Sequence, residues 1–187
     1  MTGPVSVTRN GHRTYLKWHR ARRCAADPVF TGKRILEGMA LGASVEVDLV
    51  VHRGGGFAVL HDHLSLDRET TGTGPARALS PAQMRALHLR GNDGQPIADH
   101  VMLLEDLCAL LRETPPSPTG LLQLDFKEDD ASLDHGLIEG FRRTMACIAD
   151  RCMVSGHDWR AVSRLAKAVP GLRCGFDPCG EDTLQRL

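Results

Sequence analysis

The stretch GASVEVDLVVHRGGGFAVLHDHLSLDRETTGTGP, residues 42–75, decides how the rest of the chain is interpreted. Its first part, residues 43–51, is apolar and rich in β-branched side chains, which predicts a strand. Side chains alternate between the two faces of a strand, so Glu46 and Asp48 lie on the same face. Two carboxylates on an otherwise apolar strand repel each other and resist burial unless a cation lies between them. A salt-bridged pair on a solvated face is the alternative, and on this strand alone we weigh the two equally.

A run of glycines at residues 54–56 follows this strand. Glycine adopts positive φ without strain, so the run predicts a hairpin turn. The connection is too short for a parallel crossover, and residues 57–61 should therefore return antiparallel to the first strand. A turn centred on the middle glycine places His61 opposite Leu49, which brings a histidine close to Asp48.

Three further motifs accompany the E-x-D pair. They are the His-Asp pair at residues 61–62 with the polar tail LDRETTGTG at 66–74, the His-Arg pair at 19–20, and Asp125 two residues before Lys127. In this order and spacing, the four motifs resemble the glycerophosphodiester phosphodiesterase family. Each motif alone is a weak signal, but four in order are a strong one, and the resemblance runs from about Tyr15 to Phe176.

The resemblance implies a (β/α)8 TIM-barrel fold, shared with phosphatidylinositol-specific phospholipases C and sphingomyelinase D toxins. It implies an enzyme that hydrolyses glycerophosphodiesters to glycerol 3-phosphate and an alcohol, with His19 and His61 as general acid and base and a cyclic phosphate intermediate. Arg20 and Lys127 would hold phosphate oxygens. The Pro-Glu-Asn-Thr motif that the family usually carries is replaced here by Phe-Thr-Gly-Lys at residues 30–33.

The residue types agree with this chemistry. Glu46, Asp48 and Asp125 form an all-oxygen ligand set, which suits one hard divalent cation, either Mg²⁺ or Ca²⁺. A histidine side chain titrates near pH 6.5, so His19 and His61 can exchange protons near neutral pH. Which histidine acts as the acid is left open. Barrel enzymes place such groups at the C-terminal ends of their strands.

Other functions remain open at this point. A related enzyme would cleave a lysolipid or sphingolipid head group, as lysophospholipase D and sphingomyelinase D do. Two tryptophans and one tyrosine offer little material for a membrane-docking rim, which favours small, soluble substrates. A non-catalytic barrel that only binds phosphate is the alternative outside the enzymes, and the replaced motif at residues 30–33 favours it.

Composition limits the expected partners and the expected cellular compartment. The chain has 187 residues, and its 23 basic and 23 acidic side chains balance, so nothing favours a nucleic-acid or membrane-surface partner. No apolar run reaches transmembrane length, and residues 1–15 hold no apolar core of a signal peptide. The six cysteines form no C-x-x-C motif, which predicts reduced thiols in a cytoplasmic protein.

The alternation of strands and helices predicts an α/β domain with parallel strands. We expect a polar leader at residues 1–13 and one barrel domain at 14–187. The expected strands are residues 14–19, 43–51, 57–61, 121–126, 152–155 and 172–176. A complete barrel needs two further strand–helix units, so we expect an incomplete barrel that self-associates through its open edge.

Overall fold

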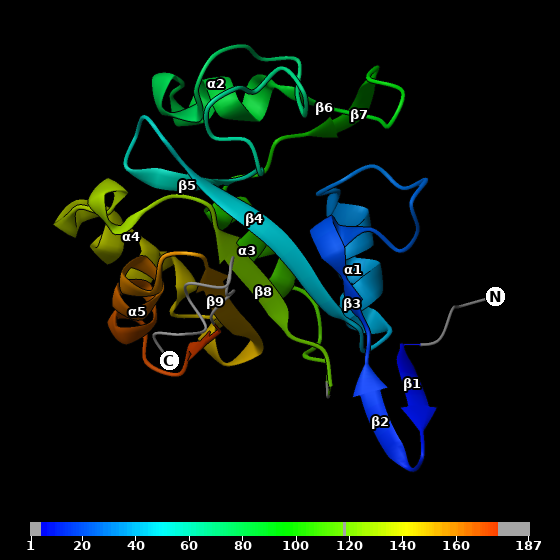
Figure 1. Cartoon of the computed structure of the whole chain (residues 1–187). Coiled ribbons are helices and arrows are strands. Elements are labelled where there is room, and N and C mark those ends of the chain that lie inside the picture. Colours follow the sequence, from blue (N-terminus) through cyan, green and yellow to red (C-terminus); the bar gives the residue numbers. More distant parts are fainter. Residues whose placement is uncertain (1–4, 118, 176–187) are drawn as a thin grey trace.

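A computed structural model describes residues 5–117 and 119–175 of the chain. Its main sheet contains six strands in the described residues (Figure 1): β3 (Lys17–Trp18), β4 (Ser44–His52), β5 (Gly56–Val59), β8 (Leu122–Phe126), β9 (Cys152–Gly156) and β10 (Arg173–Cys174). The strand order is β10-β9-β8-β4-β3, and these five strands are parallel. Only β5 runs antiparallel, as the hairpin partner of β4.

Four helices connect the parallel strands in chain order: α1 (Gly32–Ala40), α3 (Leu104–Arg112), α4 (His135–Met145) and α5 (Trp159–Ala168). This alternation confirms the predicted α/β class with a barrel-type order of strands. Between β5 and α3 the chain forms α2 (Pro81–Ala86) and a hairpin of β6 (His88–Arg90) and β7 (Pro96–His100). Figure 1 shows this group beyond the β5 end of the main sheet. Within the described residues β3 and β10 do not pair, so the sheet is open there.

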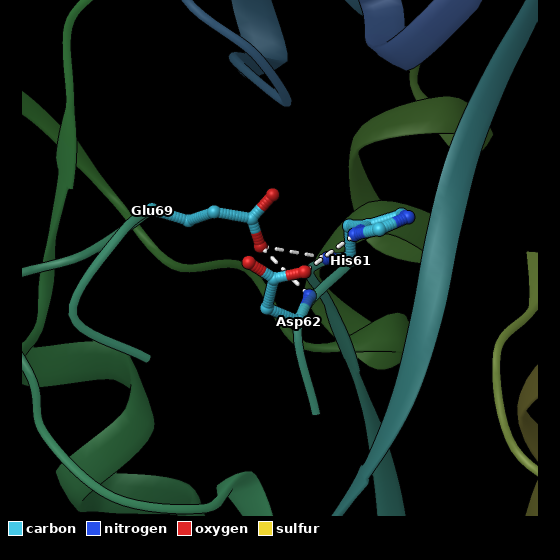
Figure 2. A group of neighbouring side chains, drawn as sticks. All are labelled: His61, Asp62 and Glu69. Carbon is cyan, nitrogen blue, oxygen red and sulfur yellow. Dashed lines mark hydrogen bonds and ion pairs between the residues drawn. The ribbon is translucent and has the colours of Figure 1, made fainter. Parts of the chain in front are cut away.

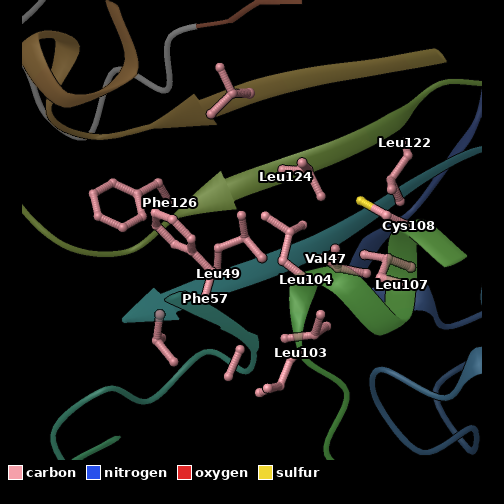
Figure 3. Close-up of a cluster of buried hydrophobic side chains, with 14 of the residues drawn as sticks. Val47, Leu49, Phe57, Leu103, Leu104, Leu107, Cys108, Leu122, Leu124 and Phe126 are labelled. Atoms are coloured by element: carbon pink, nitrogen blue, oxygen red, sulfur yellow. The ribbon is translucent and has the colours of Figure 1, made fainter. Parts of the chain in front are cut away.

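The core between the sheet and α3 explains which way the strand residues face. Val47 and Leu49 of β4 pack with leucines of α3 and with Leu124 of β8 (Figure 3). Each leucine buried in this way contributes about 1.5–3 kcal/mol. Because the odd-numbered side chains of β4 take this apolar face, the alternation directs Glu46 and Asp48 to the opposite face.

Aromatic rings extend the core to the tip of the β4–β5 hairpin. The ring of Phe57 lies edge-on to Phe126 at 5.9 Å and to Phe141 at 5.4 Å between centroids. Such pairs add about 0.5–1.5 kcal/mol beyond burial of their area. They fix the hairpin, and therefore the segment that follows it, against β8 and α4.

The hairpin register differs from the prediction. Leu49 pairs with Val59, and His52 pairs with Gly56, so the turn is centred on Gly54 instead of Gly55. His61 therefore lies beyond the end of β5 and is not opposite Leu49. The glycine run allows either centre, and the apolar contacts of Phe57 decide between them.

The N-terminal region also departs from the expected order. A hairpin of β1 (Ser6–Arg9) and β2 (His12–Tyr15) precedes the sheet, and the expected boundary after residue 13 falls inside β2. The expected strand at 14–19 divides into β2, β3 and a turn (His19–Ala21) in which Arg20 and Ala21 adopt left-handed backbone angles, φ 52° and 57°. The division into leader and barrel domain stays a prediction.

Helix ends follow their sequence signals closely. The capping box at α2 is present: the amide N–H of Gln83 donates to Ser80 Oγ, and the side chain of Gln83 accepts from the amide of Ser80. Helix α1 begins after Thr31 and ends before Gly42, which has φ +80°. The β6–β7 hairpin was not predicted.

The described cysteines carry free thiols: Cys24, Cys108, Cys147, Cys152 and Cys174. Cys179 lies outside the described residues, as do the end of the predicted strand at 172–176 and the loop after it. Over the described ranges, no helix has the length and apolar character needed to cross a membrane.

Candidate functional site

Three carboxylates from two neighbouring strands form the centre of the site. Glu46 and Asp48 come from β4, and Asp125 of β8 is the register partner of Asp48. Each offers an oxygen, and these oxygens lie within 4.8 Å of one another. Exposed fractions of 3%, 0% and 6% make them a buried cluster and not a solvated pair. The structure thus brings together all three residues predicted to bind a metal.

Two cations contact this cluster from either side. Lys127 Nζ lies 2.7 Å from Asp48 Oδ1 and also donates to Asp125 Oδ2. Arg20 Nε lies 3.3 Å from Asp48 Oδ2. Burial lowers the pKa of Lys127, but the hydrogen bonds that its ammonium group donates to Asp125 and Asp48 outweigh burial and leave that pKa raised. Lys127 therefore stays charged at neutral pH and neutralises part of the buried carboxylate charge.

Glu46 has weaker compensation. Its Oε2 accepts a 2.6 Å hydrogen bond from the backbone N–H of Arg20, whose left-handed conformation presents that group. Burial, and then the charge of Asp48, raise the pKa of Glu46 to about 8. A non-glycine residue in the left-handed region costs roughly 1–2 kcal/mol, and here that cost accompanies a contact to the cluster.

His19 lies at the rim of the cluster. Its Nε2 is 3.8 Å from Glu46 Oε2, and its side chain is 69% exposed. Burial of part of the ring and the charge of Arg20 lower the pKa of His19. The ring is therefore neutral at pH 7 and able to accept a proton.

His61 belongs to a neighbouring group shown in Figure 2. Its Nδ1 is 2.7 Å from Asp62 Oδ1. Glu69 Oε2 accepts hydrogen bonds from the backbone N–H groups of both residues, at 2.9 and 3.0 Å. The other oxygen of Glu69 is 3.9 Å from Arg20 Nη1. This group is therefore linked to the carboxylate cluster through Arg20.

A cavity of about 380 Å³ lies at this group and is lined by Arg20, His61 and Glu69, among others. It joins two of the predicted site residues, His61 and Arg20. His19 is not among its described lining residues. The joint role of His19 and His61 as general acid and base therefore stays a prediction.

Sequence reasoning missed the part played by Glu69. Glu69 is buried. Its carboxylate accepts hydrogen bonds from the backbone of His61 and Asp62 and also lies near the guanidinium of Arg20. The only sequence signal is an acidic residue inside the polar tail at 66–74. Its buried contacts depend on the folded path of that loop and could not be seen in the sequence.

Solved structures match this chain, whereas no protein-family model and no curated protein sequence does. A glycerophosphoryl diester phosphodiesterase from Parabacteroides distasonis superposes with a TM-score of 0.66 at 16% identity, over 91% of this chain and 56% of that chain. The chain has the fold of these phosphodiesterases.

Two further structures agree. A glycerophosphodiester phosphodiesterase from Agrobacterium tumefaciens gives a TM-score of 0.65 at 20% identity, over 85% of this chain and 64% of that one. A phosphodiesterase from Oleispira antarctica, in complex with the product sn-glycerol-3-phosphate, gives 0.61 at 17% identity, over 92% and 70%. The chain spans less than two thirds of the first two structures. The (β/α)8-type fold predicted from the motifs is confirmed.

Proposed function

We propose that this chain hydrolyses glycerophosphodiesters to glycerol 3-phosphate and an alcohol. The observation that carries the proposal is the buried cluster of Glu46, Asp48 and Asp125 flanked by Arg20 and Lys127. Carboxylates with adjacent cations suit a divalent ion and a phosphate group together. The likeness in fold to phosphodiesterases supports the same reaction class.

The donor set fits one divalent cation. All three ligating side chains offer oxygen, and all three are buried, so a bound ion would relieve their mutual repulsion. Oxygen ligands favour Mg²⁺ or Ca²⁺. When bound, the ion would supply charge stabilisation for the phosphoryl oxygens.

The remaining steps fall to side chains of this chain. Arg20 and Lys127 bind phosphate oxygens and orient the diester. His19, neutral at pH 7, takes the proton from a hydroxyl of the substrate's glycerol, which attacks phosphorus to form a cyclic phosphate. His61 gives a proton to the departing alkoxide, and Asp62 Oδ1 at 2.7 Å from Nδ1 holds the ring so that Nε2 carries out the transfer. Water then opens the cyclic phosphate with the two histidine roles reversed.

The test is release of glycerol 3-phosphate from glycerophosphoglycerol by the 187-residue chain, with Mg²⁺ or Ca²⁺ and in excess chelator. We expect hydrolysis that needs the cation and that falls about 100-fold or more in Asp48→Asn, equivalent to roughly 2.7 kcal/mol. Asp150→Asn, an exposed carboxylate outside the cluster and outside both cavities, is the control. Full turnover in chelator would contradict the metal requirement. No turnover under any condition would contradict the proposed activity and favour the alternative of a barrel that only binds phosphate.

The proposal also includes the cellular compartment and the kind of substrate. The reduced thiols expected from the sequence favour the cytoplasm. A small, polar diester as the substrate agrees with the polar residues that line the cavity at Arg20 and His61.

A further inference from the structure

A second cavity touches the candidate site at Lys127. Its volume is about 590 Å³, within the usual size range of small-molecule sites. It shares no lining residue with the cavity that contains Arg20 and His61. We call it the Lys127 cavity. Its lining includes His63, Arg77 and His157.

One cation from each cavity contacts the same buried carboxylate, Asp48. Lys127 Nζ lies 2.7 Å from Asp48 Oδ1, and Arg20 Nε lies 3.3 Å from Asp48 Oδ2. A phosphate group bound by both cations would therefore stand between the cavities. A phosphodiester carries two substituents, and this position directs one substituent into each cavity.

The chemistry of the Lys127 cavity suits a neutral, hydroxylated group. The cations Lys127 and Arg77 are balanced by the acids Glu128 and Asp129. Arg77 is held by Glu128 Oε2 and by the carbonyl oxygen of Ser132, both at 3.0 Å. Its guanidinium is therefore a fixed donor, and the charge balance gives no advantage to a charged ligand.

Hydrogen-bonding groups complete this lining. His157 Nε2 is 3.1 Å from Asp129 Oδ1, and His63 also lines the cavity. Imidazole, carboxylate and guanidinium groups together offer donors and acceptors to several hydroxyl groups.

The lining of the two cavities does not suit a quaternary ammonium group. Proteins recognise these groups with the faces of Trp, Tyr or Phe rings. None of those residue types is among the described residues that line either cavity. Three arginines and two acids line the other cavity, and this excess of positive charge does not favour a cation there either.

We propose that the Lys127 cavity receives the alcohol group of the phosphodiester and selects a neutral polyol, such as glycerol, over a quaternary ammonium, such as choline. This inference rests on the proposed function for its substrate class. It assigns specificity to Arg77, Asp129 and His157, which lie outside the carboxylate cluster.

The experiment compares glycerophosphoglycerol with glycerophosphocholine in saturating Mg²⁺. We expect kcat/KM to favour the polyol diester at least tenfold, equivalent to about 1.4 kcal/mol. His157→Phe adds an aromatic ring and releases Asp129, so it should reduce that ratio by raising turnover of the choline diester. His135→Phe, the same substitution at an exposed site on α4, should leave the ratio unchanged.

The outcomes separate the two proposals. Hydrolysis with equal kcat/KM for both diesters, or a preference for choline, overturns the inference and leaves the proposed function standing. If neither diester is hydrolysed, the proposed function fails, and calorimetric binding of the two diesters decides the inference. Tighter binding of the polyol diester that is weakened by His157→Phe then supports it; equal binding, or none, overturns it.

Discussion

The carboxyl group of Glu46 offers a direct test of the buried cluster. Burial and the nearby Asp48 raise its pKa from 4.5 to about 8. The unfolded chain therefore releases this proton near pH 4.5, whereas the folded protein keeps it until about pH 8. The unfolded state binds fewer protons across this window, so the free energy of unfolding falls as pH rises and levels off above pH 8.

The magnitude follows from the width of the window. About 8 less 4.5 is roughly 3.5 pH units, each worth about 1.36 kcal/mol, which gives an upper limit of roughly 5 kcal/mol. The charge of Asp48 contributes to this shift, so part of the effect belongs to the interaction between the two carboxyl groups. We therefore expect roughly 3–5 kcal/mol, a large share of the 5–15 kcal/mol typical of a folded domain.

The assay is urea unfolding of the wild type and Glu46→Gln in excess chelator, from pH 5 to pH 8.5. The variant cannot ionise at this position, so its stability relative to the wild type should rise by roughly 3–5 kcal/mol across the range. The exposed Glu113→Gln should show no such trend. Saturating Mg²⁺ at pH 8 should stabilise the wild type more than Glu46→Gln. A stability difference between wild type and Glu46→Gln that stays constant with pH would refute the reasoning.

Three more outcomes are expected. His52 is buried, its ring nitrogens have no hydrogen-bond partner among the described residues, and burial lowers its pKa. The melting temperature of the wild type measured relative to His52→Leu should therefore fall as pH drops below about 6.5. Gly38→Ala would place Cβ 2.6 Å from Val45 Cγ2 and should destabilise by about 1–3 kcal/mol in urea unfolding. Gly140→Ala, also in a helix, would place Cβ at an ordinary contact distance of 3.6 Å from the carbonyl oxygen of Gly55 and should stabilise by about 0.5–1 kcal/mol. Within the described residues β3 pairs only with β4 and lies beside the exposed Leu16, which leaves one edge of β3 free for another chain. Sedimentation should therefore show a mass that increases with protein concentration, and Leu16→Lys should suppress this self-association. A monomer at all concentrations would contradict this expectation.

The strands that carry the site could be predicted because their signals are local. Alternation alone placed Glu46 and Asp48 on one face of β4, and the D-x-K spacing placed Asp125 and Lys127 together at the end of β8. That β4 and β8 are adjacent and in register is a long-range fact, which periodicity could not supply. The family resemblance implied only that their carboxylates share one metal site.

The register of the β4–β5 hairpin could not be predicted from local sequence patterns. Three consecutive glycines permit several turn centres, and the choice depends on the packing of Phe57 against Phe126 and Phe141. The resulting register moves His61 beyond β5 and into the group with Asp62 and Glu69. The buried contacts of Glu69 likewise exist only once the loop has folded.

The side-chain cations pair unequally with the carboxylates of the cluster, and this agrees with the raised pKa of Glu46. Arg20 and Lys127 both direct their side-chain charge to Asp48, and Lys127 also contacts Asp125. Glu46 receives a backbone N–H and the edge of a neutral imidazole. The two cations proposed to bind phosphate are thus the same groups that pair with Asp48 in the free protein. A bound phosphate must therefore draw on the Asp48 ion pairs, and the charge it brings makes a cation at the three carboxylates more favourable, which couples the two binding events.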